Sequence, residues 1–504
     1  MKLNTQILAD IFQSNMILPL NKDFKLGGIV NPEEKVTVKF NQQQYQTISD
    51  QNGAWQVKIN AVSDPKFVAT ILVEAGDRKQ EIENIRFGKV YLLSVQSNIE
   101  YRLKDEAHFA QVKTELSEHK YPDLHYYNVP QVDYIDPETG EVKPKEIHLE
   151  QWHQVDAENC GYMSAVGFYM IKKMREEGVA GPIAIVDCFK GGTSASVWIK
   201  KSDLAGDAEL NKKFLDEYHN QIAGKTWADF DRETEEYNQI VNKHNQDLAR
   251  YLKMHPDTSL STAKNIVGHT PWPPPARPDL FTRPCGLYET MMSQVKDCVF
   301  NGMVWYQGEN DTDRAEQYHK LLPLLIHTWR RRLHDPSLPV KLIQLPGYAD
   351  YPEDSAALIR QVQLQTAKAM PEVDLVSFVD GGEEHNIHPT NKKIVGERLG
   401  QIEVGNDYAG TPFVKKCQYS DSKLILTITR CEQLKLNSKT ILEVITENRQ
   451  KQVELTAADL NKNQIVMNLD EKPQEISYAY ANFTKEIGLY NELDYPVSPF
   501  KIRL

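Results

Sequence analysis

Long apolar runs are missing from this sequence. No stretch of about 18 apolar residues, the length that a membrane-spanning helix needs, occurs in its 504 residues. Residues 1–10 contain neither a long apolar stretch nor a small-residue cleavage site, so no signal peptide is expected. These absences predict a chain without a membrane span that is located in the cytoplasm.

Cysteine is scarce, and a basic surplus is absent. The six cysteines are scattered without a Cys-x-x-Cys pair, which predicts buried free thiols. Asp and Glu number 70 against 58 Lys and Arg, which gives a formal net charge of −12. Nucleic acids and anionic membrane surfaces favour basic patches, so neither is expected as a partner.

What is present divides the chain into three parts. Residues 1–86 alternate short apolar stretches with turn residues, which predicts a small all-β domain. Asn52-Gly53 lies between the alternating stretches 35–40 and 54–59, a pattern typical of a β-hairpin. Residues 404–504 return to this β character and predict a second β domain.

The middle part, residues 87–403, alternates apolar strand-like runs with helical stretches. This alternation predicts an α/β domain with a mainly parallel sheet that is covered on both faces. The expected strands include 183–186, 302–306, 340–345 and 373–379, and the expected helices include 161–177 and 316–333.

A helical insertion is expected within this domain, at about residues 203–280. A long polar stretch, 206–254, precedes the proline-rich segment 271–278. The pattern predicts a helical excursion and then an extended return. A solvated surface insertion and a lid over a site are both consistent with it.

Ser97 is the first residue with a pattern that suggests chemistry. It follows the apolar run 90–93, which is typical of a buried strand, so its side chain is expected at the carboxyl end of a sheet. A serine hydroxyl becomes a nucleophile when a base removes its proton and donors stabilise the resulting oxyanion. The surrounding residues lack the G-x-S-x-G pattern, and a helix-capping serine is the alternative interpretation.

Two later segments carry hydrogen-bond donors after predicted strands. Gly191-Gly192 lets the backbone approach a ligand closely, although a phosphate-binding loop or an ordinary tight turn also fits. Asn310 carries a side-chain amide that is able to stabilise an oxyanion. Its neighbours Glu309 and Asp311 offer an alternative, a pair of carboxylates for sugar hydrolysis.

His388 lies in a loop that also contains three acidic residues. A histidine that acts as a base needs an acceptor for its second ring nitrogen, usually a carboxylate. His385 stands three residues earlier, so a metal site and a solvated polar loop are the alternatives.

The order Ser97, Gly192, Asn310 and His388 resembles the four blocks of the SGNH hydrolase superfamily. Within it, Gln96-Ser97-Asn98, Gly191-Gly192-Thr193, the run 305–309 and Ile387-His388-Pro389 are similar to motifs of the sialate O-acetylesterase family. The resemblance implies an SGNH-like, flavodoxin-like three-layer domain flanked by smaller all-β regions. It also implies an enzyme without a metal or organic cofactor.

The resemblance further implies a role for each residue. Ser97 would be the nucleophile and His388 the general base and acid, with an oxyanion hole from the Ser97 and Gly192 amides and Asn310. Gln307 is an additional candidate for the oxyanion hole.

Two departures from the family pattern stand out. Val95 replaces a usual glycine, and Asn386 stands where many relatives carry an aspartate. Glu383 and Glu384 are therefore the candidate acids that orient His388, with Asp380 and a Ser-His dyad as alternatives.

These observations together predict a serine esterase. The expected reaction removes O-acetyl groups from a small-molecule sugar, with sialic acid favoured, through an acetyl-enzyme. An acetyl xylan or other carbohydrate acetylesterase is an alternative, as is a sugar-binding protein with a decayed site.

Overall fold

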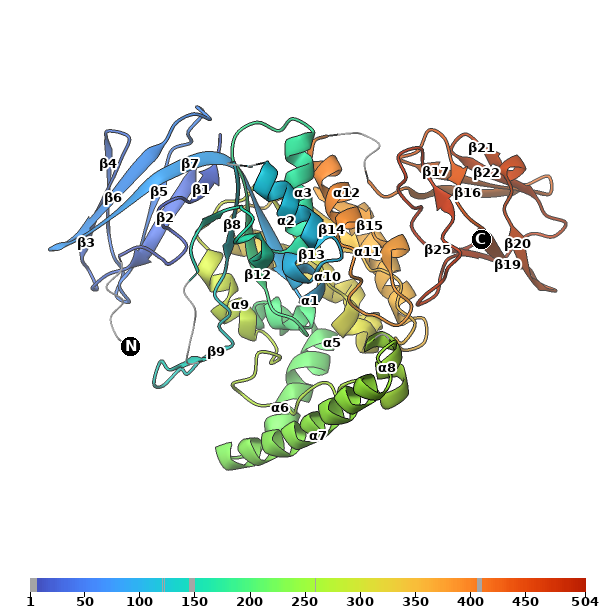
Figure 1. Ribbon diagram of the computed structural model, residues 1–504, viewed down its shortest axis with the longest axis horizontal. Helices are drawn as coiled ribbons and strands as arrows, with labels where there is room; N and C mark the ends of the chain where they lie inside the picture. Colours follow the sequence, from blue (N-terminus) through green and yellow to red (C-terminus); the bar gives the residue numbers. More distant parts are fainter. Residues whose placement is uncertain (1–6, 120, 122, 145–149, 259, 406–409) are drawn as a thin grey trace.

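The fold is described from a computed structural model. The structure describes residues 7–119, 121, 123–144, 150–258, 260–405 and 410–504. Figure 1 shows N-terminal strands at one end, C-terminal strands at the other, and a sheet with helices between them.

Strand β7 (Arg78–Val95) connects the N-terminal strands to the central sheet. Its first half pairs antiparallel with β6 (Ala69–Ala75). Its second half pairs in parallel with β12 (Ile183–Phe189) and β13 (Gly302–Tyr306). One strand of 18 residues thus runs across the expected boundary at residue 86.

The central sheet has the order β11-β8-β12-β7-β13-β14-β15, and every neighbouring pair except β11–β8 is parallel. Along the chain, β12, β7, β13, β14 and β15 follow the flavodoxin-like order 2-1-3-4-5, with β8 added outside β12. Every residue of β8, β12 and β13 is buried, as expected for parallel strands covered on both faces. The remaining bounds are β8 Leu124–Asn128, β11 His153–Gln154, β14 Val340–Gln344 and β15 Val373–Ser377.

Helices cover both faces of this sheet. Leu93 faces α3 (Ala165–Glu176), because a Cβ added to Gly167 would lie 2.7 Å from its side chain. The next residue of β7 pairs with Trp305, which stacks edge-on against Trp329 of α10 (Ala315–Arg332) at 5.8 Å. Successive residues of a strand point to opposite faces, so α3 and α10 lie on opposite sides. Helix α12 (Lys393–Glu403) packs on α3, and α11 (Ser355–Ala369) packs on α10.

The N-terminal strands correct one expectation. The stretch 54–59 (β5) pairs with β2 (Phe24–Ile29), whereas β3 (Lys35–Phe40) forms its hairpin with β4 (Gln43–Ile48). The hairpin turn uses Asn41 and Gln42, both with positive φ, as a two-residue turn of type I′ requires. Asn52-Gly53 does form a turn, but the chain there changes sheets, so the predicted pairing across it was wrong. A short parallel strand, β1 (Ile17–Pro19), pairs with β7.

The C-terminal strands form two four-stranded antiparallel sheets and a two-stranded one, β18 (Lys435–Leu436) with β24 (Leu489–Tyr490), with a hydrophobic core of their own. By contrast, the core of the N-terminal strands is continuous with that of the central sheet. The first C-terminal sheet contains β16 Phe413–Ser420, β17 Lys423–Thr429, β22 Gln464–Asn468 and β21 Leu460–Asn461. The second contains β20 Gln450–Glu454, β19 Ile441–Ile445, β23 Glu475–Tyr478 and β25 Phe500–Arg503.

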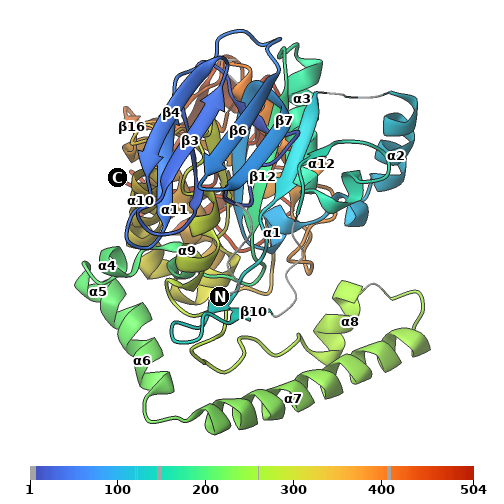
Figure 2. The same cartoon turned by 90° about the vertical axis from the view of Figure 1, so that its left-hand side faces the viewer.

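The expected insertion region is helical and then extended. Its longest helix, α7 (Trp227–Met254), begins at a capping box of Thr226 and Asp229 and buries only Phe230 and Leu248. Figure 2 shows α7 running along the edge of the molecule, with the chain returning through α8 (Leu260–Val267). The shorter helices are α4 Lys201–Leu204, α5 Ala208–Leu210, a π-helical turn at Asn211–Asp216 and α6 Glu217–Ile222.

All six cysteines are free, and four of them are buried. Within the described residues, no helix combines the length and the apolar character that crossing a bilayer requires.

Candidate active site

Three adjacent strands bring the first predicted residues to one edge of the sheet. Strands β12, β7 and β13 are neighbours and run in the same direction. Gly192 follows β12, Ser97 follows β7, and Asn310 follows β13. Carboxyl ends of parallel strands meet at one edge, so the sheet order itself gathers residues that are far apart in sequence.

Ser97 and His388 are in direct contact. The Nε2 atom of His388 lies 2.7 Å from the Ser97 hydroxyl, across a sequence separation of 291 residues. Ser97 begins the short helix α1 (Ser97–Glu100), whereas His388 lies in the long loop between β15 and α12. The pair has the arrangement of a nucleophile and its general base.

Backbone amides lie next to this pair. The Ser97 amide is the first of helix α1 and has no acceptor within the helix. Gly191 donates its amide to Glu100 at 2.7 Å, and a Cβ at Gly191 would lie 3.4 Å from the Ser97 Cβ. Gly192 has φ +69°, a conformation that favours glycine, and its amide donates to no described residue. The loop therefore presents a glycine amide close to Ser97.

A buried polar network lies around Ser97. Its neighbours Gln96 and Asn98 both donate to the carboxylate of Glu309. Asn98 also donates to the Ile387 carbonyl at 2.9 Å and accepts from Lys392 Nζ at 2.5 Å. The network joins helix α1 to the loops of Asn310 and His388.

Burial dominates the electrostatics of this network. Lys392 is fully buried, its ammonium group lies 5.0 Å from the centre of the Tyr101 ring, and burial lowers its pKa to about 7. Burial likewise raises the pKa of Glu309. Lys392 was not among the residues predicted from the sequence, because its burial depends on the tertiary fold.

The two candidate orienting acids make no hydrogen bond to the His388 ring. Glu384 forms an ion pair with Lys485 at 2.9 Å. Glu383 accepts from the Thr390 amide at 2.7 Å and from the Asn386 side chain at 2.9 Å. The third acid, Asp380, binds the Arg398 guanidinium through both carboxylate oxygens. Among the described residues, no carboxylate hydrogen-bonds the imidazole.

Asn386 instead holds the main chain of His388. Its Oδ1 accepts from the His388 amide at 3.1 Å, and its Nδ2 donates to the His388 carbonyl at 2.9 Å. Burial, followed by the charges of Lys392 and Lys264, lowers the pKa of His388 to about 4. The ring is therefore neutral near pH 7 and able to accept a proton.

The structure also bears on the alternative interpretations of this region. His385 contacts Asp350 at 3.1 Å, whereas His388 contacts Ser97. No cluster of three or more metal-binding side chains occurs within the described ranges. The Val95 side chain is fully buried, so it presents no surface to a ligand.

The remaining side chains near Asn310 are also occupied. Gln307 is buried and donates its amide to Asp311 at 2.6 Å and to the Thr193 carbonyl, which leaves it no hydrogen for an oxyanion. Asp311 further accepts from Ser194 at 2.6 Å and thereby joins the Asn310 loop to the Gly192 loop. Glu309 and Asp311 thus both lie within internal hydrogen-bond networks.

Comparisons with known proteins show similarity to carbohydrate esterases. A family model described as "Carbohydrate esterase, sialic acid-specific acetylesterase" matches residues 277–410. This region of the chain is similar to that family. The match includes Asn310 and His388, while Ser97 and Gly192 precede it. The expected relation to the sialate O-acetylesterase family, a family of carboxylic ester hydrolases, is confirmed.

Two relatives extend the similarity. The sialate O-acetylesterase of Mus musculus is 24% identical over 343 residues, which cover 63% of this chain and 56% of the mouse protein. The chain therefore spans little more than half of that relative. A carbohydrate acetylesterase from Xanthomonas citri is similar in structure, with a TM-score of 0.73, 19% identity, and coverage of 98% of this chain and 99% of that one. At this identity the likeness shows a shared fold.

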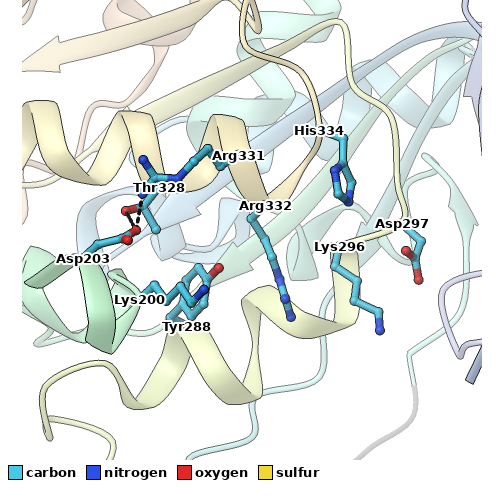
Figure 3. Close-up of a pocket in the computed structure, with 9 residues that line it drawn as sticks. All are labelled: Lys200, Asp203, Tyr288, Lys296, Asp297, Thr328, Arg331, Arg332 and His334. Carbon is cyan, nitrogen blue, oxygen red and sulfur yellow. Dashed lines mark hydrogen bonds and ion pairs between the residues drawn. The ribbon is translucent and has the colours of Figure 1, made fainter. Parts of the chain in front are cut away.

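A basic depression lies away from these residues. It has a volume of about 420 Å³ and is lined by Lys200, Lys296, Arg331, Arg332 and neighbouring side chains (Figure 3). Helix α10 has 18 residues and is therefore about 27 Å long; it begins beside the Asn310 loop and ends at this depression. The depression thus lies at the end of α10 that is remote from Asn310.

Proposed function

We propose that this chain is a serine esterase that removes O-acetyl groups from carbohydrates, with O-acetylated sialic acids as the favoured substrates. The observation that carries the proposal is the 2.7 Å contact between the Ser97 hydroxyl and His388 Nε2. It occurs where serine, glycine and asparagine follow three adjacent parallel strands, which supports an SGNH-like site.

The reaction follows from the position of each group. His388 accepts the proton of Ser97 as the serine oxygen attacks the acetyl carbonyl carbon. The Ser97 and Gly192 amides and the Asn310 side chain then stabilise the negative charge on the carbonyl oxygen. The sugar leaves as an alcohol with the proton from His388, and an acetyl-enzyme remains. Water, deprotonated by His388, hydrolyses this ester and restores Ser97.

The site works as a Ser-His dyad in this proposal. A carboxylate in a triad fixes the ring orientation and stabilises the imidazolium. Here the main chain of His388 is held by Asn386, which Glu383 binds in turn. The low pKa of His388, about 4, makes it a weaker base than a triad histidine but keeps it neutral in moderately acidic solution.

A carbohydrate acetylesterase with another sugar substrate is the second candidate. The Xanthomonas citri carbohydrate acetylesterase matches nearly the full length of both chains, whereas the mouse sialate O-acetylesterase is covered to 56%. The motifs around Ser97 and His388 are those of the reaction and do not select the sugar.

Acetate release from a panel of substrates tests the proposal. We expect hydrolysis of p-nitrophenyl acetate and faster acetate release from O-acetylated sialic acids than from acetylated xylo-oligosaccharides. Ser97→Ala is expected to lower kcat by at least about 10³-fold. Ser202→Ala, at an exposed position of α4, is the matched control and is expected to retain full activity.

Each other outcome has a distinct meaning. Background rates for both the unmodified chain and Ser97→Ala, with sugar binding retained, would favour a sugar-binding protein. Preferential release from xylo-oligosaccharides would favour the second candidate. Full activity of Ser97→Ala would contradict the role of Ser97.

A further inference from the structure

The return segment of the insertion brings Trp272 to the candidate active site. The indole Nε1 of Trp272 donates a hydrogen bond to the Asn310 side-chain oxygen at 3.1 Å. Trp272 lies in the proline-rich segment that follows α8, in the insertion for which a solvated surface excursion and a lid were both consistent with the sequence. The contact therefore joins the insertion to a residue proposed to stabilise the oxyanion.

The same indole also packs against Gly192. A Cβ added to Gly192 would lie 2.7 Å from Cζ2 and 2.9 Å from Cη2 of Trp272. Real Cβ atoms do not approach other atoms this closely, so the six-membered ring occupies the space that a side chain at Gly192 would need. One edge of the indole thus contacts both Gly192 and Asn310.

Trp272 is held in place although it is not a core residue. Its side chain is 49% exposed. The hydroxyl of Tyr237, in helix α7, donates to the carbonyl of the preceding Pro271 at 2.8 Å. The indole also packs against Phe281, with ring centres 6.4 Å apart, and Phe281 in turn lies under Lys190 of the glycine loop. Helix α7 therefore supports the segment that carries Trp272.

We propose that Trp272 is a positioning residue for the oxyanion site, acting through Asn310. A side-chain amide has one oxygen and one NH₂ group, so fixing the oxygen fixes the direction of the NH₂ group. Trp272 donates to Oδ1 of Asn310, and Nδ2 of Asn310 donates to none of the described residues. Nδ2 is left to donate to the carbonyl oxygen of the substrate as negative charge develops there. This inference rests on the proposed esterase function and assigns the insertion a part in the chemistry.

Trp272→Phe tests the hydrogen bond while it keeps an aromatic ring against Gly192. Loss of an orienting hydrogen bond is expected to lower kcat for p-nitrophenyl acetate by about tenfold, with KM changed less than about twofold. Trp227→Phe is the matched control, because Trp227 lies in the same insertion, has the same 49% exposure and contacts Phe230 and nearby cations. It is expected to retain the unmodified rate.

A double-mutant cycle separates positioning from a general structural effect. Asn310→Ala removes the group through which Trp272 acts, so adding Trp272→Phe to it is expected to cause no further loss of kcat. Tyr237→Phe leaves the indole in place but removes its support, and we expect a loss in kcat of about threefold. Thermal unfolding of each variant checks that the fold is retained.

Two results would overturn the inference. One is a Trp272→Phe variant with the kcat of the unmodified chain. The other is a fall in kcat on Trp272→Phe of about tenfold both in the unmodified chain and in the Asn310→Ala variant. If Ser97→Ala is inactive in the same assay, either result contradicts only the role of Trp272 and leaves the esterase proposal in place. If Ser97→Ala is fully active, the proposed function itself is wrong and the inference falls with it.

Discussion

The serine side and the histidine side of the candidate site are built in different ways. Ser97 follows a central strand whose last residues pair with neighbours on both sides. The side chains next to it, Gln96 and Asn98, are buried and bound to Glu309. His388 lies in a loop, and Ser97 is the hydrogen-bond partner of its ring among the described residues.

The difference shows two ways of fixing a reactive side chain. On the serine side, the sheet fixes the backbone and a buried charged network fixes the helix that follows. On the histidine side, Asn386 and Glu383 hold the main chain, and burial sets the pKa of the ring. Changes in the buried network on the serine side should therefore affect stability, whereas changes on the histidine side should affect mainly rate.

Removing the imidazole is expected to have the largest effect. His388→Ala leaves Ser97 without a base, so we expect kcat to fall by at least about 10³-fold while the unfolding temperature stays within a few degrees. Hydrolysis of p-nitrophenyl acetate and thermal unfolding measure the two quantities. His385→Ala, three residues earlier and paired with Asp350, is the control with an expected rate close to that of the unmodified chain. A comparable loss in both variants would contradict the assignment of His388.

The next largest effect is expected from the buried cation on the serine side. Lys392→Met leaves Glu309 and Asn98 buried without the ammonium group, and loss of one partner of a buried charged network costs about 3 kcal/mol. The free energy of unfolding from urea titration measures the loss. Lys393→Met is the control. Lys393 is exposed, and its Nζ lies 3.8 Å from the Glu397 carboxylate in a surface ion pair. Its expected change is within about 0.5 kcal/mol. Equal effects of the two substitutions would contradict the structural role of the network.

Much of the central fold was predictable from the sequence, for a physical reason. Parallel strands buried on both faces need continuous apolar runs, and those at 183–186 and 302–306 lie within β12 and β13. Ser97, Gly192 and Asn310 each follow such a run. The resemblance then supplied their order and suggested that they meet.

The parts that could not be predicted depend on contacts between distant segments. Asn52-Gly53 marks a turn, but the partner of β5 depends on which strand faces it in space. Glu383 stands near His388 in sequence, yet its carboxylate binds Thr390 and Asn386. Nothing local marks Trp272 as a neighbour of Asn310, because Trp272 lies within the insertion and in none of the motifs.

A smaller effect on rate is expected from the acid that holds the histidine loop. Glu383→Ala removes the acceptor of the Asn386 side chain and the Thr390 amide, so the main chain of His388 is held less firmly. We expect kcat to fall about tenfold, as for the loss of one or two orienting hydrogen bonds. Glu384→Ala is the control in the next position, and its partner Lys485 is exposed. A larger loss in Glu384→Ala than in Glu383→Ala would indicate that Glu384 is the acid that matters.

The smallest change is expected when pH is varied above the pKa of His388. The base acts in its neutral form, and burial with the nearby Lys392 and Lys264 charges disfavours the imidazolium, which lowers its pKa to about 4. We therefore expect kcat/KM to change less than about twofold between about pH 5.5 and 7.5, and to fall only as pH approaches 4. A histidine with the ordinary pKa of about 6.5 would lose about 90% of its activity at about pH 5.5.

Lys392 connects the two sides of the site in this experiment. Its own pKa is about 7, so it is charged in the acidic range where His388 titrates. Lys392→Met removes that charge and is expected to move the acid limb of the pH profile upward, whereas Lys393→Met leaves it in place. Circular dichroism at each pH identifies any loss of fold. An acid limb near the ordinary histidine pKa of about 6.5 in the unmodified chain would mean that the imidazolium is stabilised after all, as a carboxylate bound to its ring would do.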